Sequence, residues 1–129
     1  MLIFWIAVSG CAAFIPSPED TPTMRIEEQL SPRKQAEPRE IASLQLTKQG
    51  RLLLENGKVD EAITVLEQAL NIHPTNGRNY YYLSEAWLMK NNILQAKEWN
   101  HQAEMYLSDD EYWSKKVLEQ KAKIRELFK

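Results

Sequence analysis

The sequence predicts an all-α protein, built as a short α-solenoid of two helix-turn-helix repeats and a C-terminal capping helix behind a disordered tether. Three observations lead to this fold class. Apolar residues recur at spacings of three and four through residues 41–129, as they do in amphipathic helices. A two-helix pattern returns after 34 residues, which is typical of solenoids. Before it, proline is frequent and large apolar residues are scarce, so residues 16–40 are expected to be disordered.

The first repeat covers residues 43–76. Its first helix is expected to begin near Pro38 or Arg39, because proline suits the first turn of a helix. The helix carries Leu53 and is expected to end before Gly57, since glycine accepts the left-handed conformation of a helix C-terminus at no steric cost.

The second helix of this repeat is predicted from the spacing of its apolar residues. Ile63, Leu66 and Leu70 recur at intervals of three and four. Asp60 stands at a place where an N-cap would be useful, and Pro74 ends the helix because it cannot continue the hydrogen-bond pattern. Two helices this short cannot bury their apolar faces alone, so a second unit is expected.

That second unit covers residues 77–110 and agrees with the first in kind. Small residues recur where two helices must approach closely, and large apolar residues recur where they fill the space between helices. Asparagine replaces the turn glycine and is the next most tolerant residue there. The matched pairs are Gly50 with Ser84, Leu53 with Trp87, Gly57 with Asn91, Ala62 with Ala96, and Ala69 with Ala103.

This pattern resembles the tetratricopeptide repeat (TPR) family. That family has a small residue midway along the first helix, a turn glycine, and then alanine, a large apolar residue, alanine and proline in the second helix. The second repeat departs from the pattern at Asn100, where a large apolar residue is usual, and at Ser108, where proline is usual. The first repeat matches it at Gly50, Gly57, Ala62, Leu66, Ala69 and Pro74.

The second repeat and the chain after it supply three more predicted helices. Asn79–Lys90 and Ile93–Tyr106 form the second repeat, and Asp110–Phe128 follows an acidic break. The last helix lacks the small-residue pattern and is expected to close the core as a cap over residues 110–128, because a solenoid end needs a polar outer face. Its apolar stripe consists of Trp113, Val117, Ile124 and Leu127.

Residues 1–15 contain no charged side chain. Their apolar stretch is too short to cross a bilayer, which takes about 20 residues. Val8-Ser9-Gly10-Cys11 resembles the lipoprotein box of bacteria. The resemblance implies that residues 1–10 are a signal, that the peptide bond before Cys11 is cleaved, and that Cys11 carries acyl chains such as palmitate. Ala12 implies sorting to the outer membrane, with the outer leaflet of the cytoplasmic membrane as the alternative.

One feature departs from such a signal. No lysine or arginine precedes Leu2, and the apolar core before Ser9 is short. A true start codon upstream is one explanation; the alternative is a disordered apolar N-terminus that contains a cysteine by coincidence. Residues 11–40 then form the tether, with five of the chain's six prolines, and the TPR domain (residues 41–129) is expected to face the periplasm.

Composition and motifs argue against several function classes. A net charge of −2 gives no electrostatic footprint for nucleic acid. One cysteine excludes an intramolecular disulfide, and His73 and His101 have no carboxylate or thiol partner at metal-site spacing. There is no glycine-rich phosphate loop and no catalytic constellation. We therefore predict no enzyme activity, no cofactor and no small-molecule substrate.

The TPR resemblance implies a groove lined by the first helix of each repeat, which holds a segment of a partner. Chaperone-binding members of the family grip a terminal carboxylate of their partner with a clamp of side chains. The resemblance implies that the clamp positions hold Thr47, Arg51 and Tyr82 here, so a terminal carboxylate is not expected as the ligand. Tyr80 is expected to pack internally, while Tyr81, Leu88 and Met89 could serve groove or core. The predicted groove residues are Thr47, Arg51, Leu54, Glu55, Arg78, Tyr81, Tyr82, Glu85, Leu88 and Met89.

Two functions follow from this resemblance. The first is a membrane-anchored interaction module, an adaptor or scaffold that recruits another protein of the bacterial envelope. The second is a structural subunit that stacks end-on in an envelope assembly complex without binding a peptide in its groove. An apolar end face on the domain would favour stacking, and a monomer that binds a linear segment would favour the adaptor.

Overall fold

The computed structural model describes residues Ala36–Lys129, which form helices joined by short turns. The all-α prediction is confirmed for this part of the chain. The predicted signal, Cys11 and most of the predicted tether lie outside the described residues. The helices are α1 (Pro38–Glu55), α2 (Val59–Ile72), α3 (Gly77–Met89), α4 (Ile93–Leu107) and α5 (Glu111–Leu127).

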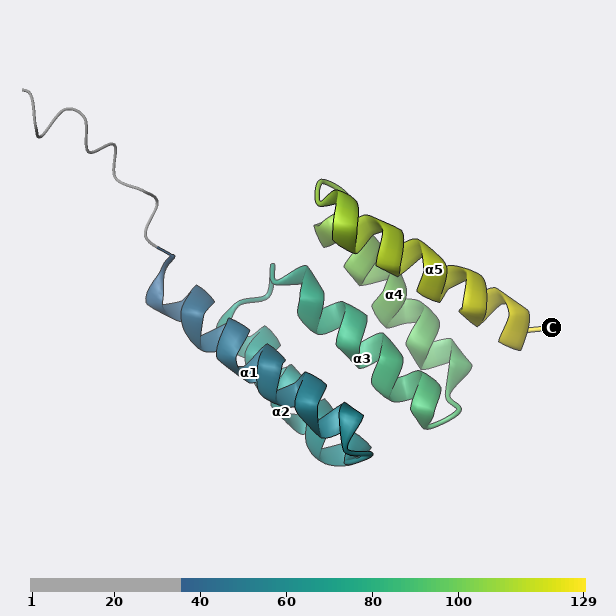
Figure 1. The fold of residues 1–129 in the computed structure, drawn as a ribbon, viewed down its shortest axis with the longest axis horizontal. Coiled ribbons are helices and arrows are strands. Elements are labelled where there is room, and N and C mark those ends of the chain that lie inside the picture. Colours follow the sequence, from purple (N-terminus) through teal and green to yellow (C-terminus); the bar gives the residue numbers. More distant parts are fainter. Residues whose placement is uncertain (1–35) are drawn as a thin grey trace, which may run out of the picture. The chain divides into compact units, whose positions relative to one another are not determined.

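The helices are arranged in two layers (Figure 1). Helix α3 contacts both α1 and α5, so α1, α3 and α5 lie side by side in one layer. Helix α2 packs against α1 and α3, and α4 packs against α3 and α5. Helix α5 therefore occupies the place of the first helix of a third repeat, and the solenoid prediction is confirmed.

The turns follow the predicted backbone conformations. Gly57 has φ +75° and Asn91 has φ +57°, so both adopt the left-handed conformation that ends the preceding helix. Helix α1 begins at Pro38, which places the first helical residues ahead of the predicted domain start at residue 41.

The N-cap predicted at Asp60 is wrong. The carbonyl oxygen of Lys58 already accepts from the Ala62 amide at 3.0 Å, so Lys58 holds the cap position and Asp60 lies in the first turn. There its carboxylate is stabilised by the positive end of the helix dipole, and it pairs with Lys90, the residue that follows α3.

Small residues hold the paired helices close together, as the repeat pattern predicts. A Cβ atom on Gly50 would lie 2.6 Å from the Leu66 side chain, so α1 and α2 meet at a distance that only glycine permits. In the second repeat the Ser84 hydroxyl donates to the Ala96 carbonyl oxygen at 2.8 Å, which ties α3 to α4. The four repeat alanines are fully buried: Ala62, Ala69, Ala96 and Ala103.

The apolar core runs through both repeats. One cluster centres on Leu66 and Leu83, and a second on Tyr80 and Val117; Trp99 packs against both and joins them. The internal packing predicted for Tyr80 is confirmed, because its ring is buried and its hydroxyl donates to the Pro74 carbonyl oxygen at 2.7 Å.

The apolar stripe predicted for α5 is correct except at its end. Trp113, Val117 and Ile124 are buried, whereas Leu127 is 53% exposed. Leu127 is the last residue of α5, and in the described part of the chain no helix follows to cover that turn. The buried stripe instead includes Gln120, a polar residue.

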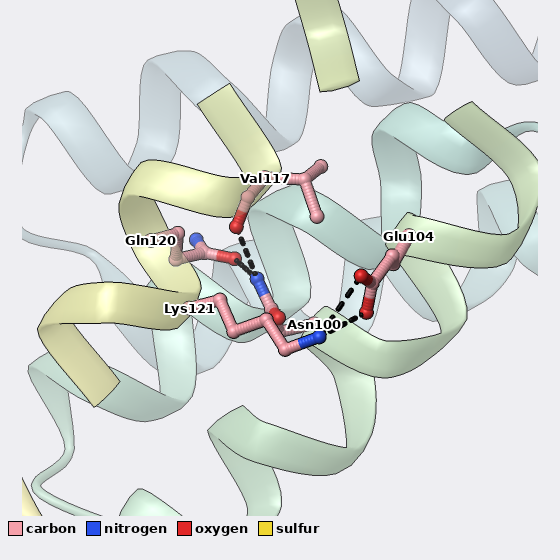
Figure 2. A network of polar contacts seen from close by, with 5 residues as sticks. All are labelled: Asn100, Glu104, Val117, Gln120 and Lys121. Atoms are coloured by element: carbon pink, nitrogen blue, oxygen red, sulfur yellow. Dashed lines mark hydrogen bonds and ion pairs between the residues drawn. The ribbon is translucent and has the colours of Figure 1, made fainter. Parts of the chain in front are cut away.

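A polar network joins α4 to α5 inside this interface (Figure 2). The Asn100 amide nitrogen donates to the Val117 carbonyl oxygen at 3.0 Å and to Gln120 Oε1 at 2.8 Å. Beside it, the Lys121 ammonium contacts both carboxylate oxygens of Glu104, at 2.7 and 2.9 Å. Asn100 thus replaces the usual apolar residue because its partners on α5 satisfy it.

Candidate interaction surface

Helices α1, α3 and α5 line an open cavity of about 560 Å³, which we call the α1/α3/α5 cavity. Three helices contribute to it, so it exists only when both repeats and α5 are in place. It mixes aromatic, apolar and charged side chains of both signs. The lining residues are Arg51, Leu54 and Glu55 of α1, Tyr81, Tyr82, Glu85 and Met89 of α3, and Tyr112, Trp113 and Lys116 of α5.

Most of the predicted groove residues meet at this cavity, but Thr47 does not line it and Leu54 contributes only a small exposed area. Thr47 and Leu54 are buried, at 4% and 9% exposure, so neither presents a free side chain to a partner. The Thr47 hydroxyl is engaged with Ser43 and Asn79 in a buried polar network, and Leu54 belongs to the core.

Two other predicted residues, Arg78 and Leu88, do not line the α1/α3/α5 cavity. Arg78 lines a smaller cavity of about 120 Å³ together with Lys48 and Arg51. Leu88 is half-buried and lines neither of these two cavities. Met89, by contrast, is 51% exposed at the rim of the α1/α3/α5 cavity.

Three aromatic rings form the wall of the cavity. Tyr81 and Tyr82 meet edge-to-face with centroids 5.3 Å apart, and Trp113 of α5 meets them at 5.4 and 5.9 Å. Edge-to-face pairs are favourable beyond the area they bury. The Tyr81 ring, half-buried, therefore serves both packing and the cavity wall.

Cations surround this aromatic wall. The Arg78 guanidinium lies 5.2 Å from the Trp113 ring centroid, and the Lys116 ammonium lies 5.6 Å from the same ring. Arg51 forms an ion pair with Glu55 one turn along α1. The cavity thus carries positive charge next to flat apolar rings.

The tyrosine hydroxyls respond to this environment. Burial, with Glu85 nearby, raises the pKa of Tyr81 to about 12. Burial also raises the pKa of Tyr82, although Arg51, Lys116 and Arg78 act in the opposite direction. Both hydroxyls are therefore neutral hydrogen-bonding groups at physiological pH.

Sequence reasoning missed the residues that α5 contributes. Gln120 donates to Glu85 at 2.7 Å and to the Tyr81 carbonyl oxygen at 3.2 Å, so it anchors α5 to the cavity face of α3. The signal that could have identified Gln120 was its position in the repeat. It lies 34 residues after Ala86, which is fully buried. A polar residue at a core position needs a partner.

Two further properties of the described residues concern metal binding and membrane crossing. Within Ala36–Lys129, no three His, Cys, Asp or Glu side chains come together in a way that could hold a metal ion. His73 is half-buried and His101 is exposed. None of the helices α1 to α5 combines the length and apolar character needed to cross a membrane.

Comparison with known proteins gives one family. A family model described as "Tetratricopeptide repeat" matches residues 53–118, from the second half of α1 into α5. No curated protein and no solved structure matches the chain.

Proposed function

Because the chain belongs to the tetratricopeptide repeat family, we propose that it binds a segment of a partner protein in the α1/α3/α5 cavity. The family is in general a protein-interaction fold, and the proposal assigns that interaction to one place. The observation that carries it is the convergence of Tyr81, Trp113 and Met89 on one open cavity. Aromatic and methionine side chains are enriched in protein interfaces.

The charges of the cavity favour a mixed partner segment. Arg51 and Lys116 line the cavity with Tyr82, and Arg78 lines the smaller cavity beside the same tyrosine, which suits an acidic residue of the partner. Glu85 also lines the cavity and suits a basic residue. An apolar side chain between these two charges would rest on the aromatic wall and contribute most of the affinity. The protein acts by binding rather than by catalysis.

We also propose that this module is held at a bacterial membrane. The support is the sequence Val8-Ser9-Gly10-Cys11, which resembles a lipoprotein box, followed by a proline-rich stretch suited to a tether. With acyl chains on Cys11, the module would recruit another envelope protein as an adaptor or scaffold at the outer membrane.

A second function, end-on stacking as a structural subunit, is favoured by a different surface. Helix α1 exposes Ile41, Leu44 and Leu52 at 47, 36 and 41%. These apolar side chains lie on the outermost first helix, where another protein's repeats could pack. In this alternative the α1/α3/α5 cavity stays empty while α1 forms the contact.

Site-specific photocrosslinking distinguishes the two functions. A photoreactive residue at Met89 reports on the cavity rim, and one at Leu52 reports on the outer face of α1. Met105, exposed on α4 and outside the cavity, is the matched control. The proposal expects one discrete adduct from Met89 in living cells and none from Met105. An adduct from Leu52 alone would contradict the cavity proposal and support stacking.

A further inference from the structure

A second cavity, of about 500 Å³, lies between α4 and α5 and shares no lining residue with the α1/α3/α5 cavity. We call it the α4/α5 groove. Helix α4 contributes Lys97 and Glu104 to it, and the end of the chain contributes Lys121, Arg125 and Phe128. The two cavities can therefore be tested separately.

The repeat register explains why this groove is open. One repeat earlier, Trp87 packs against the core cluster that contains Ile63 and Leu66 of α2. The residue 34 positions later is Lys121, which instead forms the ion pair with Glu104 along the groove (Figure 2). An ion pair of two half-buried side chains thus lies where the preceding repeat places an indole ring.

The groove combines an apolar strip with an excess of basic over acidic side chains. Ile124 is almost fully buried beneath it, and Phe128 is 55% exposed beside it. The Lys97 ammonium lies 5.4 Å from the Phe128 ring centroid. Four basic side chains line the groove, Lys97, Lys121, Arg125 and Lys129, against two acidic ones, Glu98 and Glu104. Glu104 pairs with Lys121, and among the described residues Lys97, Arg125 and Lys129 form no ion pair.

We propose that the α4/α5 groove binds an acidic amphipathic helix of a partner protein. Apolar side chains of that helix would pack on Ile124 and Phe128, and its carboxylates would face Lys97, Arg125 and Lys129. Helix-in-groove recognition of this kind uses apolar anchors one turn apart. A second copy of the chain does not suit the groove, because a two-fold contact would bring the same cations together.

The probe for this proposal is a fluorescent peptide of residues 59–72, VDEAITVLEQALNI. It has the required chemistry, with Asp60, Glu61 and Glu67, no basic residue, and Ile63 and Leu66 on its apolar face. A control peptide carries Asn or Gln in place of the three carboxylates. Fluorescence anisotropy with the full-length chain measures both affinities, and analytical ultracentrifugation monitors self-association.

Charge reversal on α5 provides the matched comparison. Arg125→Glu removes a groove cation, whereas Lys123→Glu changes an exposed lysine of the same helix that does not line the groove. The proposal expects Arg125→Glu to weaken binding of the acidic peptide about tenfold or more, with Lys123→Glu within about twofold of the unmodified chain. Phe128→Ala should also weaken it, and the control peptide should bind more weakly than the acidic one.

Several results would overturn the proposal. No binding of the acidic peptide, or equal losses in Arg125→Glu and Lys123→Glu, would mean that the groove is not a recognition site. An unchanged affinity in Arg125→Glu would mean that the peptide binds elsewhere, for example by displacing α2. Dimerisation abolished by Arg125→Glu would assign the groove to a second copy. None of these results affects binding in the α1/α3/α5 cavity.

Discussion

Gly50 shows how much of the fold depends on single small residues. Its position midway along α1 leaves no room for a Cβ atom, because the fully buried Leu66 side chain occupies that space. The equivalent Ser84 fits because its hydroxyl reaches the Ala96 carbonyl oxygen. The sequence pattern predicts this closeness, since the family places small residues where two helices meet.

We expect Gly50→Ala to destabilise the domain even though alanine favours helices. Overpacking against Leu66 should cost about 1–3 kcal/mol, and the gain in helix propensity should offset no more than about 1 kcal/mol of it. Gln49→Ala, an exposed change on the same helix turn, is the control. Urea unfolding followed by circular dichroism measures both. A Gly50→Ala variant as stable as Gln49→Ala would show that α1 and α2 do not meet as described.

Buried polar residues mark the limit of what the sequence predicts at this scale. Thr47 was predicted in the groove, but it lies in a buried network with Ser43 and Asn79. Nothing in the local sequence distinguishes a hydroxyl that faces a partner from one that faces an asparagine 32 residues away. Asn100 was recognised as a departure from the family pattern, yet its partner Gln120 could be identified only in three dimensions.

At the scale of helices, the sequence predicted the helices of residues 36–129, with their boundaries within one or two residues. Helix α4 begins at the predicted Ile93, and α5 begins one residue after Asp110, which caps it. Helix α3 begins at Gly77, before the predicted Asn79, because the Asn76 side chain caps it there. Cap geometry of this kind depends on a single side-chain rotamer, so apolar spacing cannot locate it.

Helix α5 does more than close the core, which was the role predicted for it. It brings Trp113 and Lys116 to the α1/α3/α5 cavity and binds α3 through Gln120. The predicted groove therefore contained only the α1 and α3 side. Recognising α5 as the first helix of a third repeat requires its contact with α3, which its sequence does not reveal because the small-residue pattern is missing.

The N-cap of α5 offers a direct test of this element. Asp110 Oδ1 accepts a hydrogen bond from the Trp113 amide at 3.1 Å. Replacing Asp110 with alanine should cost about 0.5–2 kcal/mol of unfolding free energy. Asp109→Ala, at the exposed neighbouring position outside the cap, should change it by less than about 0.5 kcal/mol. Equal effects of the two changes in urea unfolding would contradict the capping role and point to a general charge effect.

At the scale of the whole molecule, the fold was predictable and the site only partly so. The repeat spacing determines which helices are neighbours, so it also brings Arg51 and Glu85 to one cavity across 34 residues. It does not reveal how far each side chain is covered by α5. The α4/α5 groove could not be predicted either. It depends on the ion pair that Lys121 forms with Glu104 at a position where the preceding repeat has an aromatic residue.

The proposed membrane anchor predicts a defined effect of Cys11→Ser. Without the thiol no acyl chain can be attached. Labelled palmitate should therefore no longer be incorporated into the protein, and the protein should disappear from membrane fractions. The measurement is fatty-acid labelling of the full-length chain in a bacterial host. Absence of label in the unmodified chain would contradict the lipoprotein interpretation and leave the binding module unaffected.

The most direct test of the central claim is the affinity of the crosslinked partner for purified variants. Tyr81→Ala and Met89→Ala alter the cavity, Arg51→Ala removes one of its charges, and Met105→Ala is the exposed control. With folding checked by circular dichroism, we expect about tenfold weaker binding for Tyr81→Ala, a smaller loss for Arg51→Ala, and no change for Met105→Ala. Folded Tyr81→Ala and Met89→Ala variants that bind with unchanged affinity would contradict the claim.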